Sequence, residues 1–336
     1  TFVYSDFFTL LVENFPKVFR AALFSPGEKD SYIRFSKSFH RSLKLPLNDT
    51  ELLKLITDLA RLVKTNLDAA MIEKINGLGS IPVLPEVYIR LEREINRPTF
   101  SMNRIAEIIQ ADPLMVARIL HVAHSSFFNI PTGVSNLLQA LNFLGVNIVS
   151  TLVLYVKLFT LKDVSPQTQN MLKAIKAHSM SVAKYSKAIM ERETKNKNLI
   201  EQAYISGLLH DVGKVALIQL SDKEKQLAYS QNFHNLASAE VEEKLFGVSH
   251  INIGSYILQL WNFQDEIVQA VASHHNSDFP EEGTLSLGEV LYSANLYCHE
   301  AENITTNISG SNRSGRFGQW DNLFQDDIRP ALDLPI

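Results

Sequence analysis

The chain has 336 residues and a mass of 37.9 kDa, which leaves room for about two domains. Hydrophobic residues make up 46% and charged residues 20%, so a disordered or fibrous chain is excluded and a globular one with a core is favoured. The formal net charge of −4 gives no strong basic field, and we expect no binding to DNA.

The single cysteine, Cys298, cannot form an intrachain disulfide, which suits a reducing cytoplasm. Apolar runs are short and interrupted; the run 147–160 contains Lys157 and is too short and polar to cross a bilayer. No signal peptide is visible, so we expect a cytoplasmic protein without a membrane partner. The chain starts at Thr1 rather than Met, as a fragment of a longer protein would.

Apolar residues recur at spacings of three and four along most of the chain, which predicts amphipathic helices. Such stretches occur at 52–63, 105–109, 116–123 and 200–208. Breaks are predicted at 76–80, at 131–133, at Leu144-Gly145, at 195–198 and at 279–283. Asp112-Pro113 is typical of a helix start, and Ser165-Pro166 opens a long helix that runs to about Glu193. The fold class is therefore predicted to be all-α.

Composition divides the chain into three segments. Residues 1–75 are predicted to be helical, and their aromatic side chains are expected to form core. Residues 76–302 read as one continuous set of helices. Residues 303–336 are rich in Asn, Ser and Gly and are expected to form an irregular tail.

His210 and Asp211 are adjacent in a stretch that is otherwise apolar and predicted to be helical. Asp is unfavourable in the middle of a helix because its carboxylate competes for backbone hydrogen bonds. A metal site is one explanation, since imidazole and carboxylate together suit Fe, Mn or Zn. A buried His–Asp pair without an ion is the other. Gly207, on the same stretch, would let a second helix approach closely.

Four more histidines lie in predicted helices or at their ends. His178, taken alone, is typical of a packed core residue. His250 lies near a helix start, where the simple alternative is a partly exposed residue of the capping region. His274 and His275 lie where a helix ends, and two surface histidines there would complement the helix dipole.

The order of these residues resembles the HD superfamily of metal-dependent phosphohydrolases. The resemblance implies a metal-ligand set of His178, His210, Asp211, His250, His274, His275 and Asn295. It implies catalytic roles for Asp211, which would bridge two ions, and for Lys214, which matches the family's lysine. The implied cofactor is one or two divalent ions of Fe, Mn or Zn, and occupancy is not fixed by the sequence.

Two departures from the HD pattern stand out. The Gly-Tyr-Pro signature of one branch is absent after His275, where the sequence reads Asn276-Ser277-Asp278. Asn295 stands where the superfamily has its distal Asp, and a neutral amide holds a divalent cation less well than a carboxylate. His299 shares a helix face with Asn295 and would either replace that ligand or lie at the surface.

An ordered series of short motifs upstream resembles the HDOD domain, a bacterial relative of HD phosphohydrolases that usually lacks the catalytic set. The series comprises Ile81-Pro82-x-Leu84-Pro85, Ile105-Ala106-x-Ile108-Ile109, Asp112-Pro113-Leu114, Arg118-Ile119-Leu120, Ala123-His124-Ser125-Ser126-Phe127-Phe128 and Gln139-Ala140-x-x-x-Leu144-Gly145. The family usually has Asn where this chain has His124. The resemblance implies a multi-helix bundle of HDOD and HD type, here with extra N-terminal helices.

The HDOD pattern and Asn295 favour a bacterial signal-transduction or regulatory protein that acts mainly through protein partners and without catalysis. The alternative is a metal-dependent phosphohydrolase of the HD superfamily acting on a phosphodiester or nucleotide, such as a cyclic dinucleotide. In that alternative Lys214 would neutralise negative charge that develops on phosphate. A metal-binding sensor without turnover is a third hypothesis.

Overall fold

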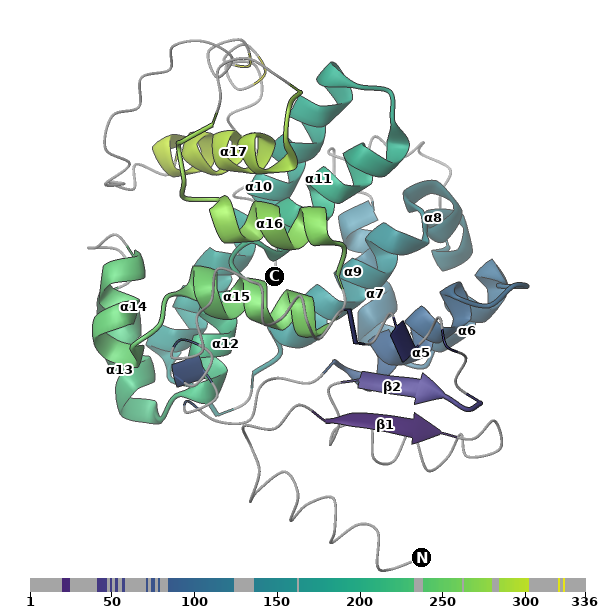
Figure 1. The fold of residues 1–336 in the computed structure, drawn as a ribbon, viewed down its shortest axis with the longest axis horizontal. Helices are drawn as coiled ribbons and strands as arrows, with labels where there is room; N and C mark the ends of the chain where they lie inside the picture. The colour runs from purple at the N-terminus through teal and green to yellow at the C-terminus, as the bar shows by residue number, and fades with distance from the viewer. Residues whose placement is uncertain are drawn as a thin grey trace, which may run out of the picture. The chain divides into compact units, whose positions relative to one another are not determined.

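The structure of the chain is a computed structural model (Figure 1). It describes residues 84–123, 136–161, 163–232, 238–261, 263–279 and 284–301, with 20–24, 41–46, isolated positions between 49 and 78, Trp320 and Leu323. The chain packs as two compact units. One is Leu84–Leu161, and the other combines Thr1–Val83 with Lys162–Ile336. This division by packing cuts across the predicted segment 76–302.

The unit Leu84–Leu161 is helical throughout its described residues. Its helices are α5 (Glu86–Ile95), α6 (Met102–Gln110), α7 (Pro113–Ala123), α8 (Leu137–Leu144) and α9 (Val146–Leu158). One predicted helix start and one predicted break are confirmed. Asp112 precedes α7 and its Oδ1 accepts a hydrogen bond from the Met115 N–H at 3.2 Å, and Gly145 separates α8 from α9. Helix α9 is buried on nearly every side, which explains its uninterrupted apolar sequence.

Within the described residues, no single helix has both the length and the apolar character needed to cross a membrane. The consecutive helices α8 and α9 reach that threshold only when taken together, and they are bent by 114° at Gly145.

The second unit holds the remaining helices. They are α10 (Pro166–Glu193), α11 (Lys197–Leu209), α12 (Val212–Leu220), α13 (Lys223–Asn232), α14 (Ser238–Phe246), α15 (His250–Leu260), α16 (Asp265–Ser273) and α17 (Leu287–Ala301). The predicted long helix is confirmed as α10, and the Ser165 hydroxyl caps it by accepting the Thr168 N–H. Helix α16 packs between α15 and α17, as Figure 1 shows.

The prediction that residues 1–75 are helical is wrong at two places. Strand β1 (Ala21–Phe24) pairs in parallel with β2 (Arg41–Lys44), with Ala21 opposite Arg41 and Phe24 opposite Lys44. Four residues are too few to display a strand's alternation, and pairing between distant segments leaves no local signal. The aromatic residues expected to form core in this segment lie outside the described residues. Most of the predicted tail does too, but Trp320 is buried and donates a hydrogen bond to Glu193 at 2.9 Å.

Two glycines let helices of this unit approach closely enough to build one central cluster of side chains. A Cβ on Gly207 of α11 would lie 2.5 Å from the Ala183 Cα of α10, so only glycine permits this crossing. A Cβ on Gly213 of α12 would lie 1.9 Å from the carbonyl oxygen of His250, the first residue of α15. The close approach predicted at Gly207 is thereby confirmed, and the one at Gly213 was not foreseen.

Candidate metal centre

His210 and Asp211 lie at the junction of two helices rather than within one, which corrects the expectation of a continuous helix. His210 follows the last residue of α11 and Asp211 precedes the first residue of α12. The junction removes the conflict that an aspartate would create inside a helix, because Asp211 stands at the N-cap position of α12, just outside the helix. The His210 Nδ1–H donates to the Gly207 carbonyl at 2.8 Å, which fixes the ring and leaves Nε2 as a lone pair.

Asp211 is buried, and its two carboxylate oxygens have different surroundings. Oδ2 accepts a hydrogen bond from Lys214 Nζ at 2.8 Å, whereas Oδ1 has no hydrogen-bond partner among the described residues. Burial acts to raise the pKa of the Asp211 carboxyl, but His210 and the Lys214 ammonium hold it well below its usual range. Asp211 is therefore an anion with one unused oxygen in the protein interior.

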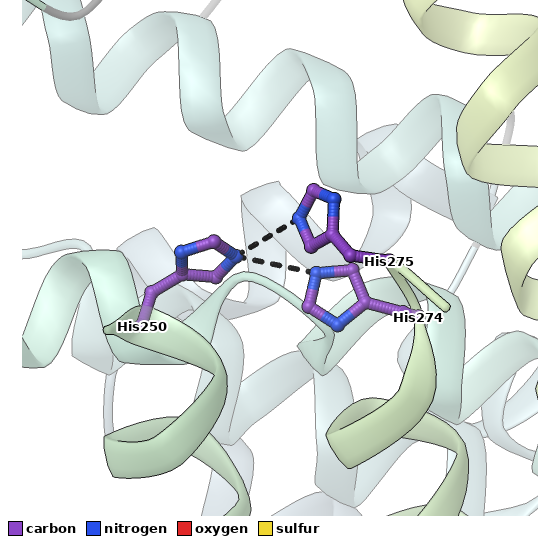
Figure 2. Close-up of side chains that lie close together, drawn as sticks. All are labelled: His250, His274 and His275. Carbon is purple, nitrogen blue, oxygen red and sulfur yellow. Dashed lines mark hydrogen bonds between the residues drawn. The ribbon is translucent and has the colours of Figure 1, made fainter. Parts of the chain in front are cut away.

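His250, His274 and His275 converge on one another (Figure 2), and the first two of them lie near the Asp211 Oδ1 atom. The Nε2 atom of His250 lies 3.3 Å from His274 Nε2, 3.2 Å from His275 Nε2 and 3.5 Å from Asp211 Oδ1. His250 begins α15, while His274 and His275 follow the end of α16, so the packing of these two helices creates the group. The simple alternative of two surface histidines is wrong for His274, which is 0% exposed.

The ring hydrogen bonds in this group turn the Nε2 atoms toward one another. The Nδ1–H of His274 donates to the Val271 carbonyl at 2.6 Å, and the Nδ1–H of His250 donates to the Glu242 carboxylate at 2.6 Å. Burial holds the pKa of His274 and of His275 well below the usual value. A neutral imidazole has one N–H, so the Nε2 atom of His274 is an acceptor. The Nε2 atom of His250 lies within hydrogen-bond distance of the Nε2 atoms of His274 and His275, and a cation among them would replace these contacts.

The spacing of these nitrogens fits a metal ion. Imidazole nitrogens bind a tetrahedral ion such as Zn²⁺ at about 2.0–2.1 Å, which places two such nitrogens about 3.3 Å apart. The Nε2 pairs of His250 with His274 and with His275 have this separation. The residues present therefore fit a divalent cation held by three imidazoles and Asp211 Oδ1, a donor set that suits Zn, Fe or Mn.

Glu242 of α14 supports this group from behind, and sequence reasoning missed it. Its Oε2 accepts both the backbone N–H and the ring Nδ1–H of His250, and its Oε1 accepts the hydroxyl of Tyr229. A carboxylate behind a ligating histidine orients the ring and raises its basicity. Glu242 stands eight residues before His250 in the polar run Glu242-Glu243-Lys244, so the sequence offers no signal that it is buried. His250 is itself fully buried, and the alternative of a partly exposed residue is wrong.

A second group, of His178, His210 and Asp211, has its ligand atoms within 4.8 Å of one another. Burial lowers the pKa of His210 to about 3, so this ring is also neutral. His178 Nε2 is engaged by Asn295 Oδ1 at 2.9 Å, across from α17. His299 stacks on the His178 ring at 4.4 Å between centroids and is buried, so the surface alternative for His299 is wrong.

The structure thus gathers the predicted ligand set in one buried cluster. His178, Asn295 and His299 lie on one side of it, and His250, His274 and His275 on the other, with Asp211 between the two groups. Lys214 reaches the cluster through Asp211.

Comparison with known proteins agrees with this arrangement of helices. The family model described as the HDOD domain matches residues 81–277, more than half of the chain. The chain belongs to the HDOD domain family. The HDOD match includes His178, His210, Asp211, His250, His274 and His275, and it ends before α17 and therefore before Asn295.

The relatives of this HDOD protein show its fold. It is 25% identical over 217 residues to a Treponema pallidum (strain Nichols) protein named "Uncharacterized protein", covering 63% of this chain and 40% of that relative's length. A crystal structure of an HDOD domain protein with unknown function from Geobacter sulfurreducens has a TM-score of 0.56 at 20% identity, covering 84% of this chain and 99% of its own. A structure named "Putative metal-dependent phosphohydrolase" from Shewanella amazonensis has a TM-score of 0.55 at 19% identity, covering 81% and 90%.

Proposed function

We propose that this HDOD protein is a bacterial signal-transduction or regulatory protein that acts through protein partners, and that its histidine cluster holds a divalent cation as a structural element. The observation that carries the proposal is the pairing of Asn295 with His178 at 2.9 Å. In HD phosphohydrolases a carboxylate is expected there, and the amide contributes no charge to an ion. The pairing uses His178 Nε2 for a hydrogen bond within the protein.

Burial of the donors supports the same proposal. His210, Asp211, His250 and His274 are all 1% exposed or less. A phosphodiester would have to displace packed side chains before it could contact an ion among them. A structural ion needs no such access once the protein has folded around it.

The test is an activity assay on the full chain loaded with Mn²⁺, with bis(p-nitrophenyl) phosphate and cyclic dinucleotides as substrates. We expect no hydrolysis above the rate of an Asp211→Asn variant prepared in parallel. Elemental analysis of the same samples verifies that the wild-type protein contains metal during the assay.

One observation favours a second candidate, the metal-dependent phosphohydrolase of the HD superfamily. Asp211 turns Oδ1 toward His250 and Oδ2 toward His210, as a ligand shared by two ions would. Lys214 Nζ lies 2.8 Å from Oδ2. A bound divalent ion would supply Lewis-acid chemistry, and His250, His274, His275 and Asp211 would hold it. Lys214 would neutralise negative charge on the substrate. Hydrolysis that Asp211→Asn and Lys214→Gln both abolish would establish this candidate in place of the regulatory one.

A further inference from the structure

We infer that Asp211 is shared between two unlike cations, the Lys214 ammonium on Oδ2 and a single divalent ion on Oδ1, so that the chain binds one ion rather than two. The inference rests on the metal centre of the proposed function and deepens it. It assigns the ion to the side of His250, His274 and His275. In this arrangement the Lys214 ammonium bonds to the oxygen of Asp211 that a second ion would otherwise use.

The Oδ2 side of Asp211 already has its positive charge. The Lys214 ammonium lies 2.8 Å from Oδ2, and both side chains are buried, at 6% and 1% exposure. A charge-assisted hydrogen bond of this length in the interior is strong. His210 Nε2 lies 3.5 Å from the same oxygen, so an ion between them would compete with the ammonium for it.

One of the two histidines on that side, His178, is also committed to a partner within the protein. His178 Nε2 and Asn295 Oδ1 satisfy each other at 2.9 Å, and a metal on His178 would have to break this bond. In return the ion would gain a neutral amide oxygen in place of a carboxylate. In the group of His178, His210 and Asp211, the His178 Nε2 and Asp211 Oδ2 atoms are therefore already engaged, and of the three atoms on this side only His210 Nε2 is without a hydrogen-bond partner among the described residues.

The Oδ1 side has the opposite character. Oδ1 is buried without a hydrogen-bond partner in the described part of the chain, and it lies 3.5 Å from His250 Nε2 and 3.9 Å from His274 Nε2. Both rings bond through Nδ1 elsewhere, so their Nε2 atoms face this oxygen. An anionic oxygen without a hydrogen-bond partner and two converging imidazole nitrogens, all in the interior, form a site for one cation.

The test counts Mn²⁺ per chain by elemental analysis after chelation, reloading and dialysis, in a matched pair of variants. His275→Gln and His178→Gln make the same change on opposite sides of Asp211. We expect one ion in the wild type, at least a tenfold weaker Mn²⁺ affinity in His275→Gln, and an unchanged count in His178→Gln. Two ions or none in the wild type, or loss of the ion from His178→Gln alone, would overturn the inference.

A second pair keeps the test decisive if His178→Gln does not fold. Asn295→Asp alone should still bind one ion, because Lys214 still occupies Oδ2, whereas Asn295→Asp with Lys214→Gln should bind two. A second ion in Asn295→Asp alone refutes the role given to Lys214. These counts are independent of the hydrolysis assay, so an active wild type with one ion would defeat the proposed regulatory function and leave this inference standing.

Discussion

Glu242 accepts two hydrogen bonds from a single residue, the backbone N–H of His250 at 2.7 Å and its ring Nδ1–H at 2.6 Å. The first fixes the start of α15 and the second fixes the ring, so one carboxylate sets both the position and the rotation of the imidazole. Tyr229 holds the other oxygen of Glu242. The direction in which His250 Nε2 points is therefore determined from α13 and α14, outside the ligand set.

Replacing Glu242 with Gln should weaken metal binding without removing a ligand. The amide cannot accept both His250 hydrogen bonds through an anionic oxygen, so the ring loses its orientation and basicity. Loss of such an outer partner typically costs about 10–100-fold in metal affinity. Equilibrium dialysis with Mn²⁺ measures this affinity. The matched control is Glu243→Gln, which makes the same change at the next residue, where the side chain is exposed.

Tyr229→Phe should give a smaller loss in the same assay, because it removes only the hydroxyl that holds Glu242. The metal-free proteins should be compared by thermal denaturation at the same time. If Glu242→Gln and Glu243→Gln bind Mn²⁺ equally, Glu242 has no positioning role and its contacts serve folding alone.

The helices of the metal centre were largely predictable, since apolar spacing and caps mark them. Ser165-Pro166 gave the start of α10, and the order of His178, His210-Asp211, His250 and His274-His275 gave the cluster. What could not be predicted depends on distant contacts. Glu242 contacts His250 through the packing of α14 against α15, and no local feature of the sequence marks this contact. The HD resemblance placed Asn295 and His178 in one ligand set, but the sequence did not predict that they hydrogen-bond to each other.

The buried ion pair of Asp211 with Lys214 should be strongly coupled. Asp211→Asn removes the charged partner of a buried ammonium, and breaking such a pair costs about 3–5 kcal/mol of the free energy of unfolding. Adding Lys214→Met to that variant should recover part of the loss, because no buried charge of the pair remains. Urea denaturation of the metal-free wild type, of Asp211→Asn, of Lys214→Met and of the double variant gives the coupling free energy of the pair. Strict additivity of the two single changes would show that the two side chains are not coupled.

The stability of the metal-free chain should fall as the pH is lowered from about 6.5. The pKa of His210 is lowered to about 3, and burial also holds those of His274, His275 and His299 well below the usual value. In this range the unfolded chain binds protons that the folded chain does not, so the free energy of unfolding rises with pH. Above the pKa of histidine in the unfolded chain, these rings are neutral in both states, so the free energy of unfolding should no longer change with pH through them.

Each such histidine can contribute up to about 1.4 kcal/mol per pH unit. Urea denaturation at pH 7.5, 6.5 and 5.5 covers the window and stays above the range in which Asp211, with its lowered pKa, would add to the effect. In His275→Gln, the free energy of unfolding should change less steeply with pH, because one of the histidines that contribute to this slope is gone. A stability that is flat from pH 7.5 to 5.5 would mean that these rings are not buried and neutral.

Gly213 should tolerate no side chain. A Cβ there would lie 1.9 Å from the carbonyl oxygen of His250 and 2.7 Å from its carbonyl carbon, and both atoms belong to the backbone of α15. Helix α15 would have to move away from α12, which carries His250 away from Asp211. We expect Gly213→Ala to lower the free energy of unfolding by about 3 kcal/mol and to weaken Mn²⁺ binding as well.

Gly254 faces Gly213 across the same crossing and provides the control for this prediction. A Cβ on Gly254 would meet its nearest neighbour, the Gly213 nitrogen, at 3.2 Å, which a small adjustment relieves. Alanine also gains about 1 kcal/mol over glycine inside a helix, so Gly254→Ala should be nearly neutral. Thermal and urea denaturation of both variants, with Mn²⁺ binding measured in parallel, compare the two sides of one contact. Equal losses in the two variants would mean that the crossing adjusts freely and does not set the position of His250.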